Sequence, residues 1–275
     1  MNTILKCENL YFSYDENDNY ALNNVNLSIK KGQKIALMGA NGSGKSTFFL
    51  CCAGILKPCK GNLFFHNEKI KYDKKSLLNL RSKIGIVFQE PDNQLFCASV
   101  YEEISFGVLN LGFSEDETRL KVDNIIKTLN IQSFCEKPTH ALSGGQKKQV
   151  AIADILVMSP EIIIFDEPAS ALDPKHIKIV REIIDKLTKQ GLTVIMSTHD
   201  VDYAYDWADE IILFSDGEVI MQAKPIDIFT NNNVLNKTNL EKPTVIKLYE
   251  SISEDKINYP KNLKELETYI KARLK

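Results

Sequence analysis

The chain has 275 residues, of which 44% are hydrophobic and 25% charged, and its formal net charge is −2 at pH 7. These totals predict one large globular domain with an appendage, and the weakly negative charge gives no reason to expect nucleic acid as a partner. No run approaches the roughly 18 apolar residues of a membrane span, and the N-terminus lacks a secretory signal pattern. The six cysteines form no CxxC pair, so we expect reduced thiols in the cytosol rather than a zinc site or a disulfide framework.

The first third of the chain is dominated by segments with strand character. They are rich in β-branched and aromatic residues or are short apolar runs, and they comprise residues 4–14, 24–29, 34–38, 62–70 (a hairpin or strand pair) and 83–88. The apolar stretch from Ser46 onward predicts a buried helix directly after the strand at 34–38. The last strand ends at Gln89.

The middle of the chain has a helical pattern. Residues from about 99 to 130 are predicted to be helical, and Ser114 with Glu117 forms the Ser-x-x-Glu pattern of a capping box. A further helix is expected after Ser143.

Strands and helices alternate again in the last third. Residues 161–165 and 192–198 are buried strands, and between them Asp173 and Pro174 begin an amphipathic helix that Gly191 closes. The next segment is a hairpin with an Asp-Gly turn, and about 235–275 form a polar, lysine-rich helical appendage. The whole predicts an α/β protein with a mostly parallel sheet, an antiparallel N-terminal edge and a helical subdomain.

The stretch GANGSGKST at residues 39–47 has the pattern of a phosphate-binding loop between a strand and a helix. Glycines let backbone N–H groups converge on a phosphate, and the helix N-terminus favours negative charge. Lys45 is expected to reach the β- and γ-phosphates of a nucleoside triphosphate, and the Ser46 hydroxyl to ligate Mg²⁺.

Polar side chains at the ends of three other strands predict the hydrolytic chemistry. Asp166 and Glu167 follow a buried strand, and because adjacent strand residues point to opposite faces, we assign Asp166 to the metal and Glu167 to the attacking water. His199 occupies a position where it could sense the γ-phosphate, and the Gln89 amide could bind both water and metal.

The sequence LSGGQ at 142–146 indicates a second anion-binding helix N-terminus, about 100 residues after the first. A single nucleotide does not need two such sites from one chain. We therefore expect two chains in a head-to-tail arrangement, each offering this second site to the other's nucleotide.

Over residues 1 to about 230 the chain resembles the ATP-binding-cassette (ABC) ATPases. The family's motifs occur in order: the phosphate loop 39–46, Gln89, LSGGQ 142–146, IIIFDE 162–167, SALD 170–173 and His199. The resemblance implies a P-loop NTPase cassette with a RecA-like core, an antiparallel β-subdomain and a helical subdomain. We assign residues 1–233 to this ATPase domain, with its helical subdomain at about 90–158, and residues 234–275 to the C-terminal appendage.

The resemblance also implies roles for individual residues. Tyr14 would stack on adenine, Ser143, Gly144 and Gly145 would contact the partner chain's γ-phosphate, and Asp173 would lie in the loop that links two active sites. The predicted ATP-binding residues are Tyr14, Gly39, Asn41, Gly42, Ser43, Gly44, Lys45, Ser46, Thr47, Ser143, Gly144, Gly145 and Gln146. The predicted catalytic residues are Glu167, His199 and Gln89, and the predicted Mg²⁺ ligands are Ser46, Gln89 and Asp166.

Residues 88–114 are similar to a narrower family, the ATPases of energy-coupling-factor importers, in particular the cobalt-type ATPases called CbiO. This similarity implies a peripheral protein on the cytoplasmic face of the membrane that forms a homodimer or a heterodimer with a second ABC ATPase. Its further partners would be an integral membrane coupling subunit and a substrate-binding membrane subunit. Cobalt is the first expectation for the solute and nickel the second, with a vitamin as the alternative.

Two alternative functions have less support from the sequence. A soluble cassette protein acting on DNA or ribosomes usually has two cassettes or a long coiled-coil insert, whereas about 100 residues separate Lys45 from Ser143 here. A non-hydrolysing nucleotide sensor would not need both Glu167 and His199. The chain departs from the ABC pattern at Gln149, where arginine is usual, and at Ala169, where threonine is usual.

Two apolar segments are candidates for contacts with partners. Leu95 and Phe96 would either receive a short helix of a membrane subunit or pack the helical insert against the core. Residues 263–274 have an amphipathic helical pattern that could mediate docking or dimerisation.

Overall fold

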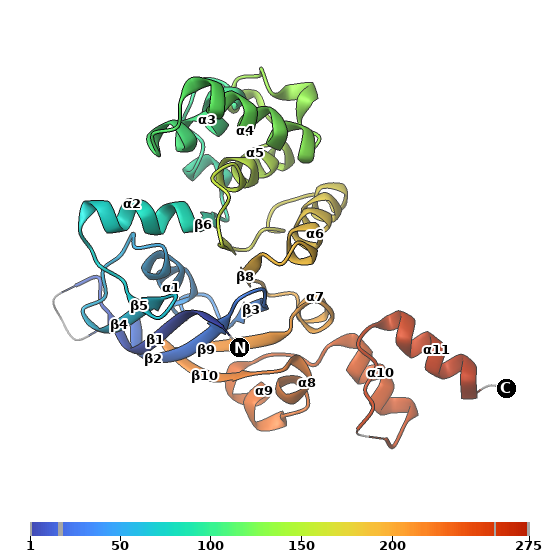
Figure 1. Ribbon diagram of the computed structural model, residues 1–275. Coiled ribbons are helices and arrows are strands. Elements are labelled where there is room, and N and C mark those ends of the chain that lie inside the picture. Colours follow the sequence, from blue (N-terminus) through green and yellow to red (C-terminus); the bar gives the residue numbers. More distant parts are fainter. Residues whose placement is uncertain (1, 16–18, 256, 274–275) are drawn as a thin grey trace.

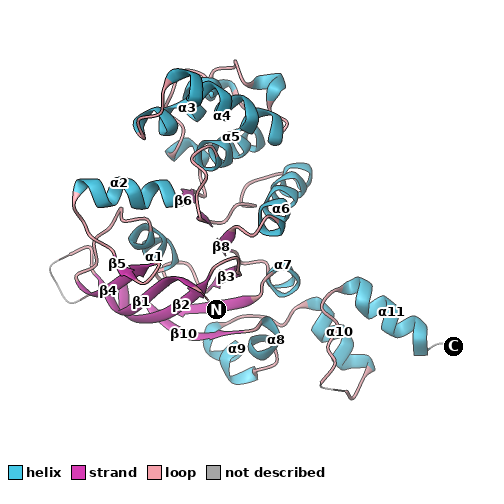
Figure 2. Cartoon of the chain, in the orientation of Figure 1, coloured by secondary structure: helices cyan, strands magenta, loops and turns pink. Residues whose placement is uncertain are grey.

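The computed structural model describes residues 2–15, 19–255 and 257–273. Its strands form two sheets, shown as arrows in Figure 1 and in magenta in Figure 2. The first sheet is antiparallel, has the order β2-β1-β4-β5, and contains β1 (Thr3–Phe12), β2 (Leu22–Lys30), β4 (Lys60–Phe65) and β5 (Glu68–Lys69). The second has the order β10-β9-β3-β8-β7-β6 and contains β3 (Lys34–Met38), β6 (Ile84–Val87), β7 (Ile162–Phe165), β8 (Thr193–Ser197), β9 (Glu210–Ser215) and β10 (Glu218–Ala223). All its pairs are parallel except β9 with β10.

The expected antiparallel edge of the parallel sheet is formed by other residues than we predicted. The N-terminal strands make a sheet of their own, and the antiparallel edge strand is β10, near the other end of the chain. The predicted Asp-Gly turn allows this reversal, since Asp216 and Gly217 have φ of 50° and 79°. Side chains join the two sheets along β2 and β10: Asn23 Nδ2 donates to Glu218 Oε1 (2.7 Å) and Gln222 Nε2 donates to the Ser28 carbonyl (2.7 Å).

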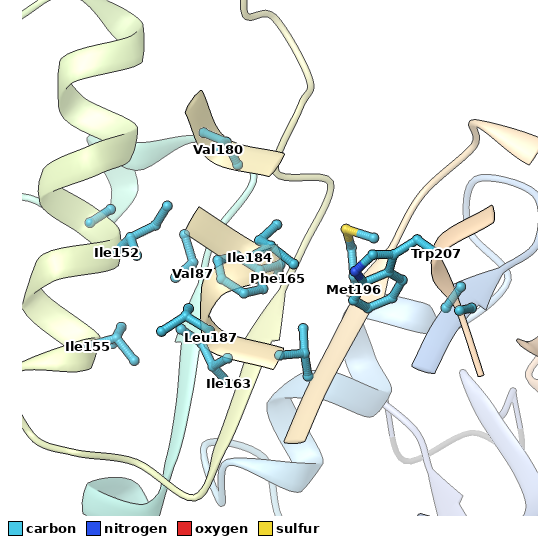
Figure 3. Packing of buried hydrophobic residues seen from close by; sticks show 14 of the residues in the cluster. Val87, Ile152, Ile155, Ile163, Phe165, Val180, Ile184, Leu187, Met196 and Trp207 are labelled. Carbon is cyan, nitrogen blue, oxygen red and sulfur yellow. The ribbon is translucent and has the colours of Figure 1, made fainter. Parts of the chain in front are cut away.

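The parallel strands have apolar residues on both faces because both faces are covered. On β7, Ile162 and Ile164 face a core between the two sheets, whereas Ile163 and Phe165 face a core under the helices. Figure 3 shows the second core, in which Ile163 and Phe165 lie with residues of the neighbouring helices and strands: Val87, Ile152, Ile155, Val180, Ile184, Leu187, Met196 and Trp207. Each fully buried side chain of this size contributes roughly 1.5–3 kcal/mol to folding.

Seven α-helices accompany these strands in the described part of residues 2–207: α1 (Lys45–Cys52), α2 (Lys74–Lys83), α3 (Val100–Asn110), α4 (Glu115–Thr128), α5 (Gly144–Leu156), α6 (Pro174–Lys189) and α7 (Val201–Trp207). The helical region expected over 99–130 consists of two helices, because the chain turns at Gly112 (φ +86°) between α3 and α4. The predicted capping box at Ser114 and Glu117 is confirmed. Helices α2 and α7 were not predicted.

The helices α3, α4 and α5 gather into a body at the top of Figure 1, and they share a hydrophobic core with one face of the parallel sheet. This body is inserted between β6 and β7, which are neighbours in the sheet. Helix α5 leads back to the sheet and packs closely on β6: a Cβ added to Gly85 would lie 2.1 Å from Ile155 Cγ2. Gln149, which replaces the usual arginine, is buried on α5 and its amide approaches the Leu129 carbonyl at 3.5 Å.

The C-terminal part consists of α8 (Pro225–Phe229), α9 (Asn232–Thr238), α10 (Thr244–Ile252) and α11 (Leu263–Arg273), so the boundary expected at 233/234 falls inside α9. Helices α10 and α11 extend to one side of the core in Figure 1. They are joined to α7, since Asp202 accepts from the Thr244 N–H (2.6 Å) and Asn262 Nδ2 donates to Asp206 Oδ1 (3.1 Å). Residue 274, the last of the predicted amphipathic segment 263–274, lies outside the described range.

Across the described ranges, no helix is both long enough and apolar enough to cross a membrane.

Candidate functional site

The phosphate loop connects β3 to α1 and its shape depends on glycine at two positions. Gly39 and Gly44 have φ of +148° and +103°, which side-chain-bearing residues rarely adopt. A Cβ on Gly39 would lie 2.2 Å from the Phe214 carbonyl oxygen, and one on Gly44 would lie 2.6 Å from that of Ala21. The loop is therefore wedged between β9 and the start of β2, which leaves Asn41 and Gly42 on its exposed side.

Lys45 is buried against this loop. Within the described chain, the hydrogen-bond partners of its ammonium are all carbonyl oxygens of the loop. Its Nζ donates to the carbonyl oxygens of Gly39 (2.8 Å) and Ala40 (2.9 Å). Burial lowers the pKa of Lys45, and the negative charges of Glu167 and Asp166 oppose this shift. The Ser43 hydroxyl is buried in the same loop without a hydrogen-bond partner in the structure. A glycine-shaped loop with a buried ammonium and an unsatisfied hydroxyl fits the phosphates of a nucleotide.

Ser46 and Asp166 meet at the start of α1 and the end of β7. Ser46 Oγ donates to Asp166 Oδ2 (2.7 Å), and the other carboxylate oxygen accepts from Ser197 Oγ (2.6 Å). Ser197 is fully buried and also accepts from the Glu167 N–H (2.8 Å), so it orients both acids. The paired hydroxyl and carboxylate oxygens are ligands of the kind that Mg²⁺ prefers. The described residues hold no cluster of three or more His, Cys, Asp and Glu side chains that could bind a metal without phosphate.

Glu167 lies between the two other predicted catalytic side chains. Gln89 Nε2 donates to Glu167 Oε2 (3.2 Å), and His199 Nε2 lies 2.9 Å from Glu167 Oε1. Gln89 Nε2 also lies 3.2 Å from Ser170 Oγ. The structure thus brings Gln89, Glu167 and His199 together at the ends of β6, β7 and β8.

The reason we gave for the different directions of Asp166 and Glu167 is wrong. Strand β7 ends at Phe165, so neither acid belongs to the strand. Glu167 has a left-handed backbone (φ +43°), which is uncommon for a residue with a side chain. This local turn, rather than the alternation of a strand, directs Glu167 toward Gln89 and His199.

Tyr14 lies beside the start of α1 and is 64% exposed. Its hydroxyl is 3.1 Å from Thr47 Oγ1, and its ring makes an edge contact with the buried ring of Phe12, at a centroid distance of 4.9 Å. These contacts present an open aromatic face next to the phosphate loop, as stacking on a base requires.

The signature residues 143–146 form the N-terminus of α5 on the helical subdomain. Ser143 and Gln146 make a capping box: the Gln146 N–H donates to Ser143 Oγ (3.3 Å), and the Ser143 N–H donates to Gln146 Oε1 (3.1 Å). Within the described ranges no hydrogen bond joins these residues to the phosphate loop. The structure therefore places the two predicted anion sites on different bodies of one chain (Figure 1).

Gly145 lies against a residue that we did not select from the sequence. A Cβ on Gly145 would lie 2.0 Å from His176 Cδ2, whereas one on Gly144 would have nothing within 4 Å. His176 Nδ1 is 2.5 Å from Asp173 Oδ2, and Asp173 also caps α6 by accepting from the His176 N–H (3.0 Å). His176 thus connects the signature to Asp173. No motif in the sequence around His176 indicates that this residue would lie beside the signature.

The segment after Gln89 is held from inside and is exposed only in part. The Gln94 side chain accepts from the Phe88 N–H (3.3 Å) and donates to the Ala151 carbonyl of α5 (3.0 Å), which fixes the segment to that helix. Leu95 packs against the core, whereas Phe96 is 67% exposed and contacts the Phe106 ring at 4.9 Å. Leu95 therefore packs the insert against the core, whereas a contact of Phe96 with a membrane subunit stays a prediction.

Comparisons with known proteins agree with this geometry. The family model described as "ABC transporter" matches residues 22–170, which is more than half of the chain. The energy-coupling factor transporter ATP-binding protein EcfA of Methanococcus maripaludis is 45% identical over 255 residues, which cover 92% of this chain and 91% of that protein. EcfA3 of Clostridium perfringens is 44% identical over 252 residues, covering 91% and 88%.

Two solved structures have the same fold. The structure of CbiO1 from Clostridium perfringens, described as part of the ABC transporter complex CbiONQ, has a TM-score of 0.76 and 44% identity and covers 91% of this chain and 100% of that chain. The ATP-binding cassette MJ0796, solved as a dimer bound to ADP and Pi, has a TM-score of 0.73 and 33% identity and covers 81% and 99%. The chain belongs to the ABC transporter family as an ATPase cassette, and within that family it resembles the ATP-binding proteins of energy-coupling-factor transporters.

Proposed function

We propose that this chain hydrolyses ATP as the engine of an energy-coupling-factor importer, bound to the cytoplasmic face of the cell membrane. The observation that carries the proposal is the position of Glu167, whose carboxylate lies between Gln89 and His199 while Asp166 next to it is paired with Ser46 of the phosphate loop. This is the arrangement that phosphoryl transfer to water requires, since a base must lie beside the site that holds the γ-phosphate.

Each residue of the site has a distinct task in this proposal. Lys45 exchanges its loop carbonyls for the β- and γ-phosphates, and Tyr14 stacks on the adenine. Ser46, Asp166 and Gln89 would hold Mg²⁺, which when bound neutralises charge on the phosphate oxygens. Glu167 accepts the proton of the attacking water, and His199 fixes the Glu167 carboxylate and contacts the γ-phosphate.

We further propose that the site is completed by a second cassette. The signature residues Ser143, Gly144 and Gly145 form a helix N-terminus far from the phosphate loop of their own chain, so they are available to a partner's nucleotide. The relative MJ0796 was solved as a dimer bound to ADP and Pi, which supports this arrangement. Both a homodimer and a heterodimer satisfy the geometry.

The solute that we propose is cobalt, with nickel and a vitamin as the alternatives. Support comes from the similarity to CbiO1, which is described as part of the complex CbiONQ. In this proposal an integral membrane coupling subunit contacts the helical subdomain and a separate membrane subunit binds the solute. Uptake of labelled cobalt, nickel or vitamin by cells that express the whole transporter distinguishes the three, and uptake of a vitamin alone would contradict the choice of a metal.

Glu167→Gln tests the hydrolytic role. Glutamine keeps the size of the side chain and one acceptor oxygen but cannot accept the proton, so hydrolysis should fall by about 100-fold or more. ATP binding should persist, and sedimentation with Mg-ATP should show a dimer. Glu161→Gln is the matched control, because Glu161 lies at the opposite end of β7, paired with His66 at 2.8 Å. Hydrolysis at the wild-type rate by Glu167→Gln would refute the assignment.

A further inference from the structure

Lys148 is a buried cation that the proposed reaction does not use. It lies on α5, is 0% exposed, and no carboxylate of the described residues is within ion-pair distance of its ammonium. Its Nζ donates instead to the backbone carbonyl oxygens of Phe88 (2.8 Å) and Gln89 (2.7 Å). An ammonium is costly to bury unless its protons are used, and here two of them bind successive carbonyls at the end of β6.

The same peptide segment is held by α5 through a second contact. The Phe88 N–H donates to Gln94 Oε1 (3.3 Å), and Gln94 Nε2 in turn donates to the Ala151 carbonyl of α5 (3.0 Å). Both backbone polar groups of Phe88 are thus tied to α5, the carbonyl through Lys148 and the N–H through Gln94. The position of Gln89 is consequently fixed relative to this helix.

Helix α5 also carries the signature at its N-terminus, since Ser143 caps it and Lys148 follows little more than one turn later. At the other end of the connection, the Gln89 side chain contacts the Glu167 carboxylate. One continuous series of contacts therefore runs from Glu167 through Gln89 and Lys148 to the residues that would meet the partner's nucleotide.

We propose that Lys148 is a positioning residue: it locks the backbone of Gln89 to α5, so that displacement of Gln89 by a bound nucleotide moves the signature as a unit. This inference rests on the proposed function. A hydrogen-bonded lysine that only stabilised the fold would have no specific dependence on Gln89, and this difference makes the inference testable.

The experiment is a double-mutant cycle on the full-length chain with Lys148→Met, Gln89→Ala and the combination. Methionine retains an aliphatic stem of similar length and removes the ammonium. Because charged hydrogen bonds are at stake, kcat for ATP hydrolysis should fall about tenfold or more in Lys148→Met, while the Kd for ATP should change less than about threefold. In the Gln89→Ala background, Lys148→Met should cause no further loss of kcat.

Lys147→Met is the matched control. Lys147 is the neighbouring lysine on α5 and pairs with the exposed Asp92 at 2.5 Å, so kcat should stay within about twofold of the wild-type value.

The outcomes separate the two proposals. Wild-type kcat in Gln89→Ala contradicts the role of Gln89 in the proposed function. A loss in Gln89→Ala without a loss in Lys148→Met overturns the inference alone, and so do independent, multiplying losses in the double variant. Should Lys148→Met fail to fold, Lys148→Gln, which keeps a donor without the charge, is used in the same cycle and is judged by the same criterion.

Discussion

Substitution of Gly145 by alanine should disturb the molecule through one identified contact, the ring of His176. The added Cβ would lie 2.0 Å from Cδ2 and 2.2 Å from Cγ of that ring, where ordinary contact begins at 3.4 Å. The ring must therefore retreat by more than about 1 Å, yet it is tied to Asp173 Oδ2 at 2.5 Å. Overpacking of this kind costs roughly 1–3 kcal/mol.

A neighbouring glycine isolates this cost. Both Gly144→Ala and Gly145→Ala gain a similar helix propensity, of up to about 1 kcal/mol, but a Cβ on Gly144 meets nothing within 4 Å. The free energy of unfolding should therefore be lower for Gly145→Ala than for Gly144→Ala by roughly 1–3 kcal/mol. Urea unfolding of the two variants, followed by circular dichroism, measures the difference.

Removal of the ring should remove the cost. In a His176→Ala background, Gly145→Ala should be as stable as Gly144→Ala. Equal stability of the two alanine variants in the wild-type background would refute the reasoning, and so would a deficit of Gly145→Ala that persists without His176. Even where its stability is normal, Gly144→Ala should weaken ATP-dependent dimerisation in a Glu167→Gln background, because its methyl group would stand where we place the partner's γ-phosphate.

Two more outcomes are expected. Lys45→Met should lower ATP affinity by at least about tenfold, since the buried ammonium is replaced by a thioether of similar length; titration with a fluorescent ATP analogue measures this, and unchanged affinity would contradict the role of Lys45. Burial raises the pKa of Asp154 to about 7, with the Glu103 charge adding to the shift and a hydrogen bond from Gln94 opposing it. Between about pH 4 and pH 7 the folded state therefore holds a proton that the unfolded state has already lost. The free energy of unfolding falls as pH rises through this window. Asp154→Asn removes that fall, so its stability advantage over the wild type should grow up to pH 7 and then stay level; parallel urea-unfolding profiles from pH 5 to pH 8 would contradict the assignment.

The sequence predicts well those parts of the fold that depend on continuous local patterns. The strands β3, β7 and β8 are short runs buried on both faces, and their apolar character is visible without any partner. The phosphate loop combines such a strand with glycines whose φ and close contacts no other residue tolerates. Helix α2 was missed because only Leu80 of its ten residues is buried, although Asp73 gives it an N-cap.

The missed parts of the site depend on contacts between distant segments. Ser197 orients Asp166 from a strand 31 positions away, and Lys148 reaches the Gln89 carbonyl across 59 positions. Neither residue belongs to a sequence motif that would indicate a functional role. Ser197 is nonetheless a polar residue in an apolar strand, and Lys148 is a charged residue on a buried helix. Both exceptions to the apolar pattern lie at the candidate site.

The topology explains why residues so far apart in sequence serve one edge of the molecule. Strands β6 and β7 are parallel neighbours, and parallel neighbours must be joined by a crossover connection, usually a helix. Helix α5 returns the chain to β7, and a crossover helix runs opposite to its strands. Its N-terminus, with Ser143, therefore points toward the edge where β6 ends near Gln89 and β7 ends before Glu167. The remaining helices of the subdomain lie between β6 and this crossover helix. In the proposed dimer, a signature at the start of α5 would therefore face the partner at the same edge as the proposed hydrolytic residues. A displacement of Gln89 then has a short structural route to the signature, through the one helix that the parallel sheet requires.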